Sequence, residues 1–160
     1  MVDRPSPEPR WLDDDEHQTW MALATLMVRL PAALDRQLQR DSGLTHFEYQ
    51  VMAGLSEAPD RTMRMSVLAC FAEGQLPRLS QVATRLEKRG WLTRRPDPTD
   101  GRYTLATLTD EGMKAITTIA PAHVNTVRTL VFDALTKAQV RHLRDIGHRI
   151  NHAITNTTPR

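Results

Sequence analysis

Residues Leu76 to Gly112 have the sequence LPRLSQVATRLEKRGWLTRRPDPTDGRYTLATLTDEG, in which basic side chains are concentrated. Seven basic residues lie between positions 78 and 102: Arg78, Arg85, Lys88, Arg89, Arg94, Arg95 and Arg102. Residues 78–102 also contain three acids, Glu87, Asp97 and Asp100, so the net charge of these residues is +4, compared with +2 for all 160 residues. Charge focused on one short stretch indicates a polyanionic partner, whereas a uniform excess would not.

The pattern of this stretch predicts a helix followed by a β-hairpin. Residues Gln75 to Arg89 place apolar side chains on one helical face, namely Leu79, Val82, Ala83 and Leu86. Gly90 follows directly, as glycine commonly does at the end of a helix. Trp91 to Arg95 and Tyr103 to Leu108 are predicted as two antiparallel strands, because the six residues between them are rich in turn formers.

Three helices are predicted before this stretch. The first runs from the acidic residues Asp13–Glu16 to about Arg40, with an apolar stripe of Leu23, Met27, Leu30, Leu34 and Leu38. Thr45 and Glu48 form a capping box that begins the second, whose buried face is Phe47, Val51, Met52 and Leu55. Residues Met65 to Phe71 form a short third helix.

Two further helices are predicted after the hairpin. Thr109 caps a long helix with Met113, Ile116, Ala120, Val124, Val127 and Val131 on one side, and Pro121 should bend it. A second capping box at Thr136 and Gln139 opens the last helix, whose apolar stripe is Val140, Leu143, Ile146, Ile150 and Ile154.

The order of elements predicts a mainly α protein: a winged helix-turn-helix with a two-stranded β-hairpin wing and long N- and C-terminal dimerisation helices. The terminal helices have more apolar surface than one winged helix can cover, and a second copy in a C2 dimer is the simplest cover. The expected regions are a disordered tail (1–10), the N-terminal dimerisation helix (11–40), the winged helix-turn-helix (41–109), the C-terminal dimerisation helices (110–155) and a tail (156–160).

A helix-turn-helix uses its first helix to brace a second helix that enters the DNA major groove. Here residues 65–71 would brace and residues 75–89 would contact bases through Arg78, Gln81 and Arg85, flanked by Ser80 and Thr84. Arginine can bond guanine and glutamine can bond adenine on their major-groove edges. An ordinary amphipathic helix with a solvated basic face is the alternative, but the adjoining wing adds Arg94, Arg95 and Arg102.

The stretch from Leu79 to Gly112 resembles the signature of the MarR (multiple antibiotic resistance regulator) family of winged-helix transcription factors. The matching pieces are the RLEKRG end of the predicted helix, the arginines after it, the Asp-Gly-Arg wing tip and the Leu-Thr-Asp-Glu-Gly that follows. The segment LTHFEYQVMAGL and the order of helices also fit, so the resemblance covers roughly residues 15–155.

The resemblance implies a homodimer that binds a pseudo-palindromic operator in double-stranded DNA, usually as a repressor released by a small molecule. It places five residues at the major groove: Arg78, Ser80, Gln81, Thr84 and Arg85. It makes Arg102 the minor-groove residue, oriented by Asp100, and assigns Arg94 and Arg95 to the wing and nearby phosphates. Pro77 departs from the family pattern, in which a small polar residue is more usual at this position.

The resemblance also implies an effector, often an aromatic anion, bound between the dimerisation helices and the winged helix. Four residues lie on elements that would line this crevice: Trp20, Met27, His46 and Met52. The alternative, that these side chains are simply part of the core, is the more common outcome for such residues.

Other classes of protein lack support in the sequence. We find no glycine-rich phosphate loop, no nucleophile motif with a base and no metal-hydrolase pattern, so we expect neither an enzyme nor a cofactor. No run approaches the ~18 apolar residues of a membrane span. The single cysteine, Cys70, fits a reducing cytoplasm, and we expect it to be a buried structural thiol rather than a redox switch.

Asp145, His148 and His152 share one helical face, but a metal site needs four ligands and a solvated helix surface explains them equally well, so we predict no metal. The main hypothesis is therefore a cytoplasmic, sequence-specific DNA-binding regulator. Two alternatives remain: a winged helix that serves as a protein-interaction module, and a small-molecule or metal sensor without direct DNA readout.

Overall fold

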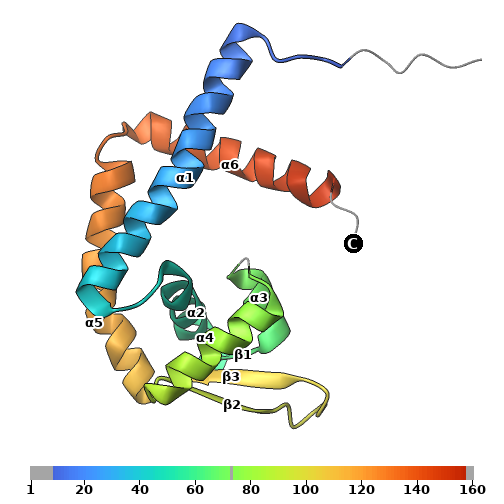
Figure 1. Ribbon diagram of the computed structural model, residues 1–160, viewed down its shortest axis with the longest axis vertical. Helices are drawn as coiled ribbons and strands as arrows, with labels where there is room; N and C mark the ends of the chain where they lie inside the picture. Colours follow the sequence, from blue (N-terminus) through green and yellow to red (C-terminus); the bar gives the residue numbers. More distant parts are fainter. Residues whose placement is uncertain (1–8, 73, 158–160) are drawn as a thin grey trace, which may run out of the picture. The chain divides into compact units, whose positions relative to one another are not determined.

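The computed structural model describes residues 9–72 and 74–157 (Figure 1). Its elements in chain order are α1 (Asp14–Ser42), α2 (His46–Glu57), a 3-10 turn (Pro59–Arg61), β1 (Thr62–Arg64), α3 (Met65–Phe71), α4 (Leu76–Lys88), β2 (Leu92–Pro96), β3 (Thr104–Leu108), α5 (Asp110–Val127), a π-helical turn (Arg128–Phe132) and α6 (Lys137–Thr157). The mainly α class, with a small antiparallel sheet, agrees with the fold predicted from the sequence.

The chain divides into two compact units, and the boundary falls inside α1 between Ala33 and Leu34. In the first unit, α1 begins with reciprocal hydrogen bonds between Asp13 and Glu16, in which each carboxylate accepts the other residue's backbone N–H. Large apolar side chains on this part of α1 are exposed: Trp20, Met21, Leu26, Met27 and Val28. The expected tails, residues 1–10 and 156–160, lie largely outside the described residues.

The second unit has one core, which is formed by α2, α3, α4, the sheet and the start of α5. Its fully buried side chains include Leu44, Val51, Met52, Leu55, Leu68, Leu79, Leu86 and Leu92. The inward faces predicted for α2 and α4 are buried as expected. The capping box at Thr45 is confirmed: the Thr45 hydroxyl accepts from the Glu48 N–H, and the Glu48 carboxylate accepts from the Thr45 N–H.

The sheet has three strands in the order β1–β3–β2, all antiparallel, so the predicted two-stranded hairpin has an additional strand. The sequence did not indicate β1, because three residues are too few to show alternation. It follows Asp60 and Arg61, whose φ angles of 50° and 53° are unusual for residues other than glycine. Gly90 ends α4 with φ of 72°, as predicted.

Two details of the sequence prediction are wrong. Cys70 is exposed, not buried, because α3 turns Met65, Leu68 and Ala69 toward the core and Cys70 away from it. The fifth helix does not continue unbroken to Val131: α5 ends at Val127, and the next five residues form the π-helical turn.

The last helix, α6, begins with the capping box predicted at Thr136 and Gln139. None of its residues is buried, and its apolar stripe is exposed at Leu143, Ile146 and Ile150. No helix among the described residues is long and apolar enough to span a membrane.

Candidate nucleic-acid interface

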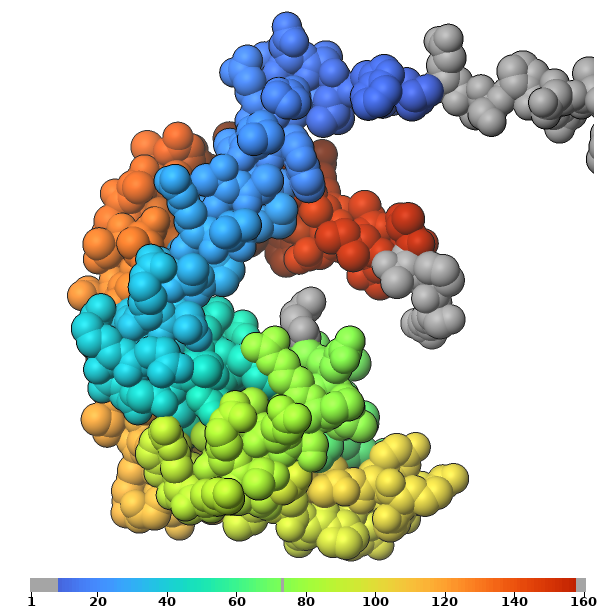
Figure 2. Space-filling model, viewed as in Figure 1, coloured from blue at the N-terminus to red at the C-terminus, as the bar shows by residue number. Residues whose placement is uncertain are grey.

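One face of α4 is fixed in the core, and this determines which side chains the helix exposes. Leu79, Ala83 and Leu86 are fully buried. Pro77 lies in the first turn, where its missing N–H removes no helical hydrogen bond. Arg78, Gln81 and Arg85 are exposed, as the sequence predicted, and we call these three residues the outer face of α4. Figure 2 shows α4 and the hairpin, coloured yellow-green and yellow, as a continuous surface.

Two arginines of the outer face are held by neighbouring side chains. The guanidinium of Arg78 lies 4.3 Å from the centre of the Phe47 ring. The Nε of Arg85 donates to Glu48 Oε1 at 2.7 Å. Burial raises the pKa of Glu48, but hydrogen bonds from the backbone and hydroxyl of Thr45 and from Arg85 outweigh burial and hold this pKa below its usual value. One carboxylate therefore caps α2 and orients an arginine of α4, a link that the sequence did not reveal.

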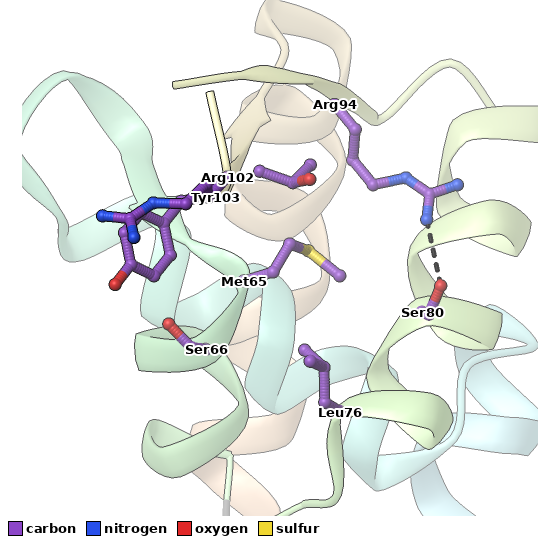
Figure 3. A pocket seen from close by; sticks show the side chains of 8 residues that line it. Met65, Ser66, Leu76, Ser80, Arg94, Arg102 and Tyr103 are labelled. Atoms are coloured by element: carbon purple, nitrogen blue, oxygen red, sulfur yellow. Dashed lines mark hydrogen bonds between the residues drawn. The ribbon is translucent and has the colours of Figure 1, made fainter. Parts of the chain in front are cut away.

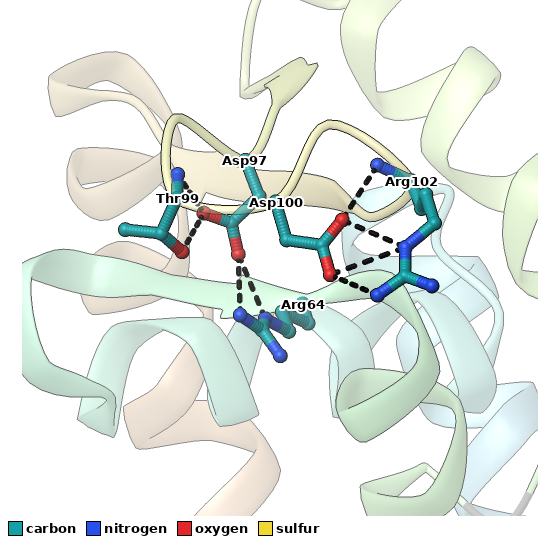
Figure 4. Close-up of polar contacts among 5 residues, drawn as sticks. All are labelled: Arg64, Asp97, Thr99, Asp100 and Arg102. Carbon is teal, nitrogen blue, oxygen red and sulfur yellow. Dashed lines mark hydrogen bonds and ion pairs between the residues drawn. The ribbon is translucent and has the colours of Figure 1, made fainter.

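The wing consists of β2, β3 and the segment 97–103 between them. At its tip, Arg102 donates from Nε to Asp100 Oδ1 at 2.9 Å and from Nη2 to Oδ2 at 2.7 Å (Figure 4). The hydrogen bonds from Arg102 lower the pKa of Asp100. The side chain of Arg102 is nevertheless 84% exposed, so Asp100 orients the guanidinium without covering it. This is the pairing expected from the sequence.

A second carboxylate fixes the base of the wing from inside. Asp97 is buried, and it accepts from the hydroxyl and backbone N–H of Thr99 and from Arg64 of β1 at 2.8 Å (Figure 4). These bonds, with those from Thr99 strongest, hold the pKa of Asp97 at about 2. The guanidinium of Arg64 also lies 4.5 Å from the centre of the Tyr103 ring. Sequence analysis predicted neither partner; the Asp-x-Thr spacing is a signal that could have identified Thr99, whereas no sequence signal identifies Arg64.

Arg94 and Arg95 are neighbours on β2 but differ in environment. Arg95 is exposed and makes no ion pair within the described part of the chain. Arg94 turns back onto α4, where it donates to Ser80, Thr84 and Glu87. Ser80 and Thr84 therefore accept hydrogen bonds from the wing, and their place at the major groove stays a prediction.

A hollow of about 230 Å³ lies between α3, the start of α4 and the root of the wing (Figure 3). Its lining combines apolar and polar side chains: Met65, Ser66, Leu76, Ser80, Arg94, Arg102, Tyr103 and Thr104. The wing is thus not packed against the start of α4 by apolar side chains at this point.

The four residues expected to line an effector crevice are in different environments. Met52 is fully buried in the core, which favours the core interpretation for that residue, whereas Trp20 and Met27 are half-exposed in the first unit. The backbone N–H of His46 donates to Asp35 Oδ1 at 2.8 Å. The centre of the His46 ring lies 5.9 Å from the centre of the His123 ring. Burial lowers the pKa of His46, although the charge of Asp35 opposes this.

The polar cluster around His46 continues into α1 and α5. His123 is buried, its Nδ1 lies 3.0 Å from Gln37 Oε1, and its ring centre is 4.3 Å from that of Tyr49. Burial, helped by the charge of His46, lowers the pKa of His123. No group of three or more His, Cys, Asp or Glu side chains among residues 9–72 and 74–157 is arranged to hold a metal ion.

Comparison with known proteins gives a consistent result. The model of the MarR family matches residues 44–104. The fold matches the crystal structure of Sco3205, a MarR family transcriptional regulator from Streptomyces coelicolor in complex with DNA, with 41% identity, 92% of each chain covered and a TM-score of 0.87. It also matches AbsC, a MarR family transcriptional regulator from the same organism, with 31% identity, 93% of this chain and 100% of that chain covered, and a TM-score of 0.87.

Among curated proteins, the transcriptional repressor MprA of Escherichia coli is 23% identical over 114 residues, which are 71% of this chain. The match spans 64% of the length of that protein.

Proposed function

This chain belongs to the MarR family and is a DNA-binding transcription regulator, and on that premise we propose that it binds a pseudo-palindromic operator as a homodimer and represses transcription until a small molecule releases it. The observation that supports this most directly is that the outer face of α4 is exposed and that Asp100 orients an exposed Arg102 on the wing. These two parts carry the donors that bases and phosphates accept.

The outer face of α4 supplies base recognition in this proposal. Gln81 can bond adenine through N6 and N7, and Arg85 can bond guanine through O6 and N7. Glu48 accepts from the Nε of Arg85, which leaves the terminal nitrogens of Arg85 to bond the guanine. Arg102 enters the minor groove, where negative potential favours a guanidinium, and Asp100 reduces the number of conformations that binding must restrict.

Dimerisation follows from the apolar side chains that one chain leaves exposed. In α6, Leu143, Ile146 and Ile150 lie on one face and are between 42% and 53% exposed. A second copy would cover this face. Two half-sites must then be about 34–36 Å apart, one turn of DNA, for both copies of α4 to enter successive major grooves. Because DNA is the partner, the protein is expected in the cytoplasm.

Repression is proposed because the E. coli relative MprA is a transcriptional repressor. Release requires two conformations of the dimer that differ in the distance between the two copies of α4 and therefore in affinity for the operator. A ligand that binds the non-operator spacing better lowers operator affinity only by its differential affinity for the two states. A small aromatic or anionic molecule is the proposed effector, and His46 is its candidate contact in the second unit.

The proposed function is tested by titrating the protein with a duplex from the region upstream of its own gene and with a random duplex, over a range of salt concentrations. We expect the upstream duplex to bind about 10³-fold tighter or more, with a strong salt dependence. Arg102→Ala should weaken binding about tenfold or more, whereas Arg141→Ala on α6 should not. Equal affinity for both duplexes would contradict sequence-specific binding and favour a protein-interaction module.

A further inference from the structure

The guanidinium of Arg94 lies along one stripe of α4. Its Nη1 donates to Ser80 Oγ at 3.2 Å, and its Nη2 donates to Thr84 Oγ1 at 2.9 Å and to Glu87 Oε2 at 2.6 Å. Ser80, Thr84 and Glu87 are spaced by four and three residues, so they lie on one face of the helix over two turns. We call these four residues the wing–helix clamp.

In the clamp, Arg94 forms an ion pair with Glu87 and is largely covered. The side chains of Arg94 and Glu87 are 24% and 30% exposed, whereas Arg102 at the wing tip is 84% exposed. The hydrogen bond from Arg94 lowers the pKa of Glu87. An arginine that is paired and bonded to three side chains has little capacity left for a phosphate.

The clamp also borders a hollow between the wing and the start of α4. Ser80 and Arg94 are on the border of the 230 Å³ hollow between the start of α4 and the root of the wing (Figure 3). Apolar side chains do not fill this space, so the polar contacts of Arg94 join the wing to α4 beside it. The clamp spans it from β2 to α4.

We propose that Arg94 is a positioning residue, which joins the wing to α4 so that both elements meet the grooves of one duplex at once, and that it does not itself contact DNA. Ser80 and Thr84 act with it and do not contact bases. This inference rests on the proposed DNA binding. Its physical basis is preorganisation: binding costs less when the two contacting elements already have the required relative orientation.

Arg94→Met, Arg95→Met and Glu87→Gln are the decisive variants, measured by salt titration of operator binding. Arg95 is the matched control, because it is exposed and adjacent on the same strand. Arg94→Met should weaken binding about tenfold without changing the slope of log affinity against log salt concentration, whereas Arg95→Met, if it contacts a phosphate, should reduce that slope by about one.

Simple electrostatics and the clamp predict opposite changes in operator affinity for Glu87→Gln. It removes a negative charge beside the DNA surface, so simple electrostatics predicts tighter binding. The clamp predicts binding several-fold weaker, and it predicts that Glu87→Gln with Arg94→Met is no weaker than Arg94→Met alone. Unchanged or tighter binding by Glu87→Gln, or a lower salt slope for Arg94→Met, would overturn the proposal.

A measurement without DNA separates this proposal from the proposed function. Amide hydrogen exchange in β2 and β3 should be faster in Arg94→Met than in the wild type and Arg95→Met, at an unchanged midpoint of global unfolding. Equal exchange in all three proteins would overturn the clamp even if operator binding were confirmed. Faster exchange in a protein that binds no operator would leave the clamp intact as a structural feature and would overturn its role in DNA binding.

Discussion

At the scale of single residues, four arginines of α4, the wing and β1 share one arrangement: a carboxylate holds the guanidinium. Glu48 holds Arg85, Glu87 holds Arg94, Asp97 holds Arg64 and Asp100 holds Arg102. An arginine side chain loses up to about 2 kcal/mol of conformational entropy when it is fixed. Because these arginines are already paired in the free protein, part of this conformational entropy is lost on folding, and DNA binding has less entropy to remove.

The pH dependence of Asp97 tests one of these pairs. Its pKa in the folded protein is about 2, below the ordinary value of 3.8, so its bonds stabilise the fold fully above about pH 4. The contribution is lost as the pH falls toward 2, because protonation removes the charge that Arg64 and Thr99 stabilise. We expect Asp97→Asn to be less stable than the wild type at pH 6, with a difference that shrinks as the pH falls below 4.

Urea unfolding of both proteins at a series of pH values measures this difference. A difference in the free energy of unfolding that stays constant from pH 6 to pH 2.5 would show that the charge of Asp97 contributes nothing.

At the scale of elements, Gly112 in the first turn of α5 makes a close contact. A methyl group at this position would collide with the backbone carbonyl of Trp91 and the side chain of Leu108. Gly112→Ala should therefore lower the free energy of unfolding by about 3 kcal/mol. Gly147→Ala is the control, since nothing lies near that position in α6, and it should leave stability unchanged or raise it by about 0.5–1 kcal/mol.

Denaturant unfolding of the two alanine variants compares them directly. If Gly112→Ala were as stable as Gly147→Ala, the junction between the wing and α5 would not be packed as described.

The elements that the sequence predicted well are those with a strong local signal. The apolar period of α4 identified all four of its buried side chains, and the capping boxes at Thr45 and Thr136 marked where two helices begin. The short strand β1 has no such signal, since its pairing with β3 depends on residues more than forty positions away. In the seven-residue α3, the sequence alone did not assign Cys70 to the exposed face.

The features of the candidate site also differ in whether a local sequence signal predicts them. The outer face of α4 and the Asp100–Arg102 pair follow from local spacing, so the sequence predicted both. The partners of Arg64, Arg85 and Arg94 depend on how separate elements pack. The family resemblance assigned Arg94 to the wing and nearby phosphates, whereas the fold turns its side chain toward α4.

At the scale of the whole molecule, α6 tests the proposed homodimer. Ile146→Glu places a charge in the exposed apolar stripe, and burying it against a second copy would be costly. We expect this variant to shift toward monomer at micromolar concentration in sedimentation velocity and to bind the operator more weakly. His148→Glu, on the other side of the same helix, should remain dimeric. Identical sedimentation of both variants would exclude this stripe from the interface.

The central claim is that two copies of α4 provide sequence recognition in duplex DNA, and selection from a random duplex pool followed by sequencing tests it most directly. The wild type should enrich an inverted repeat with half-site centres about one turn of DNA apart. Gln81→Ala should enrich the same repeat with preference relaxed at one symmetry-related position in each half. Absence of an enriched repeat, or a base preference in Gln81→Ala identical to that of the wild type, would contradict the account.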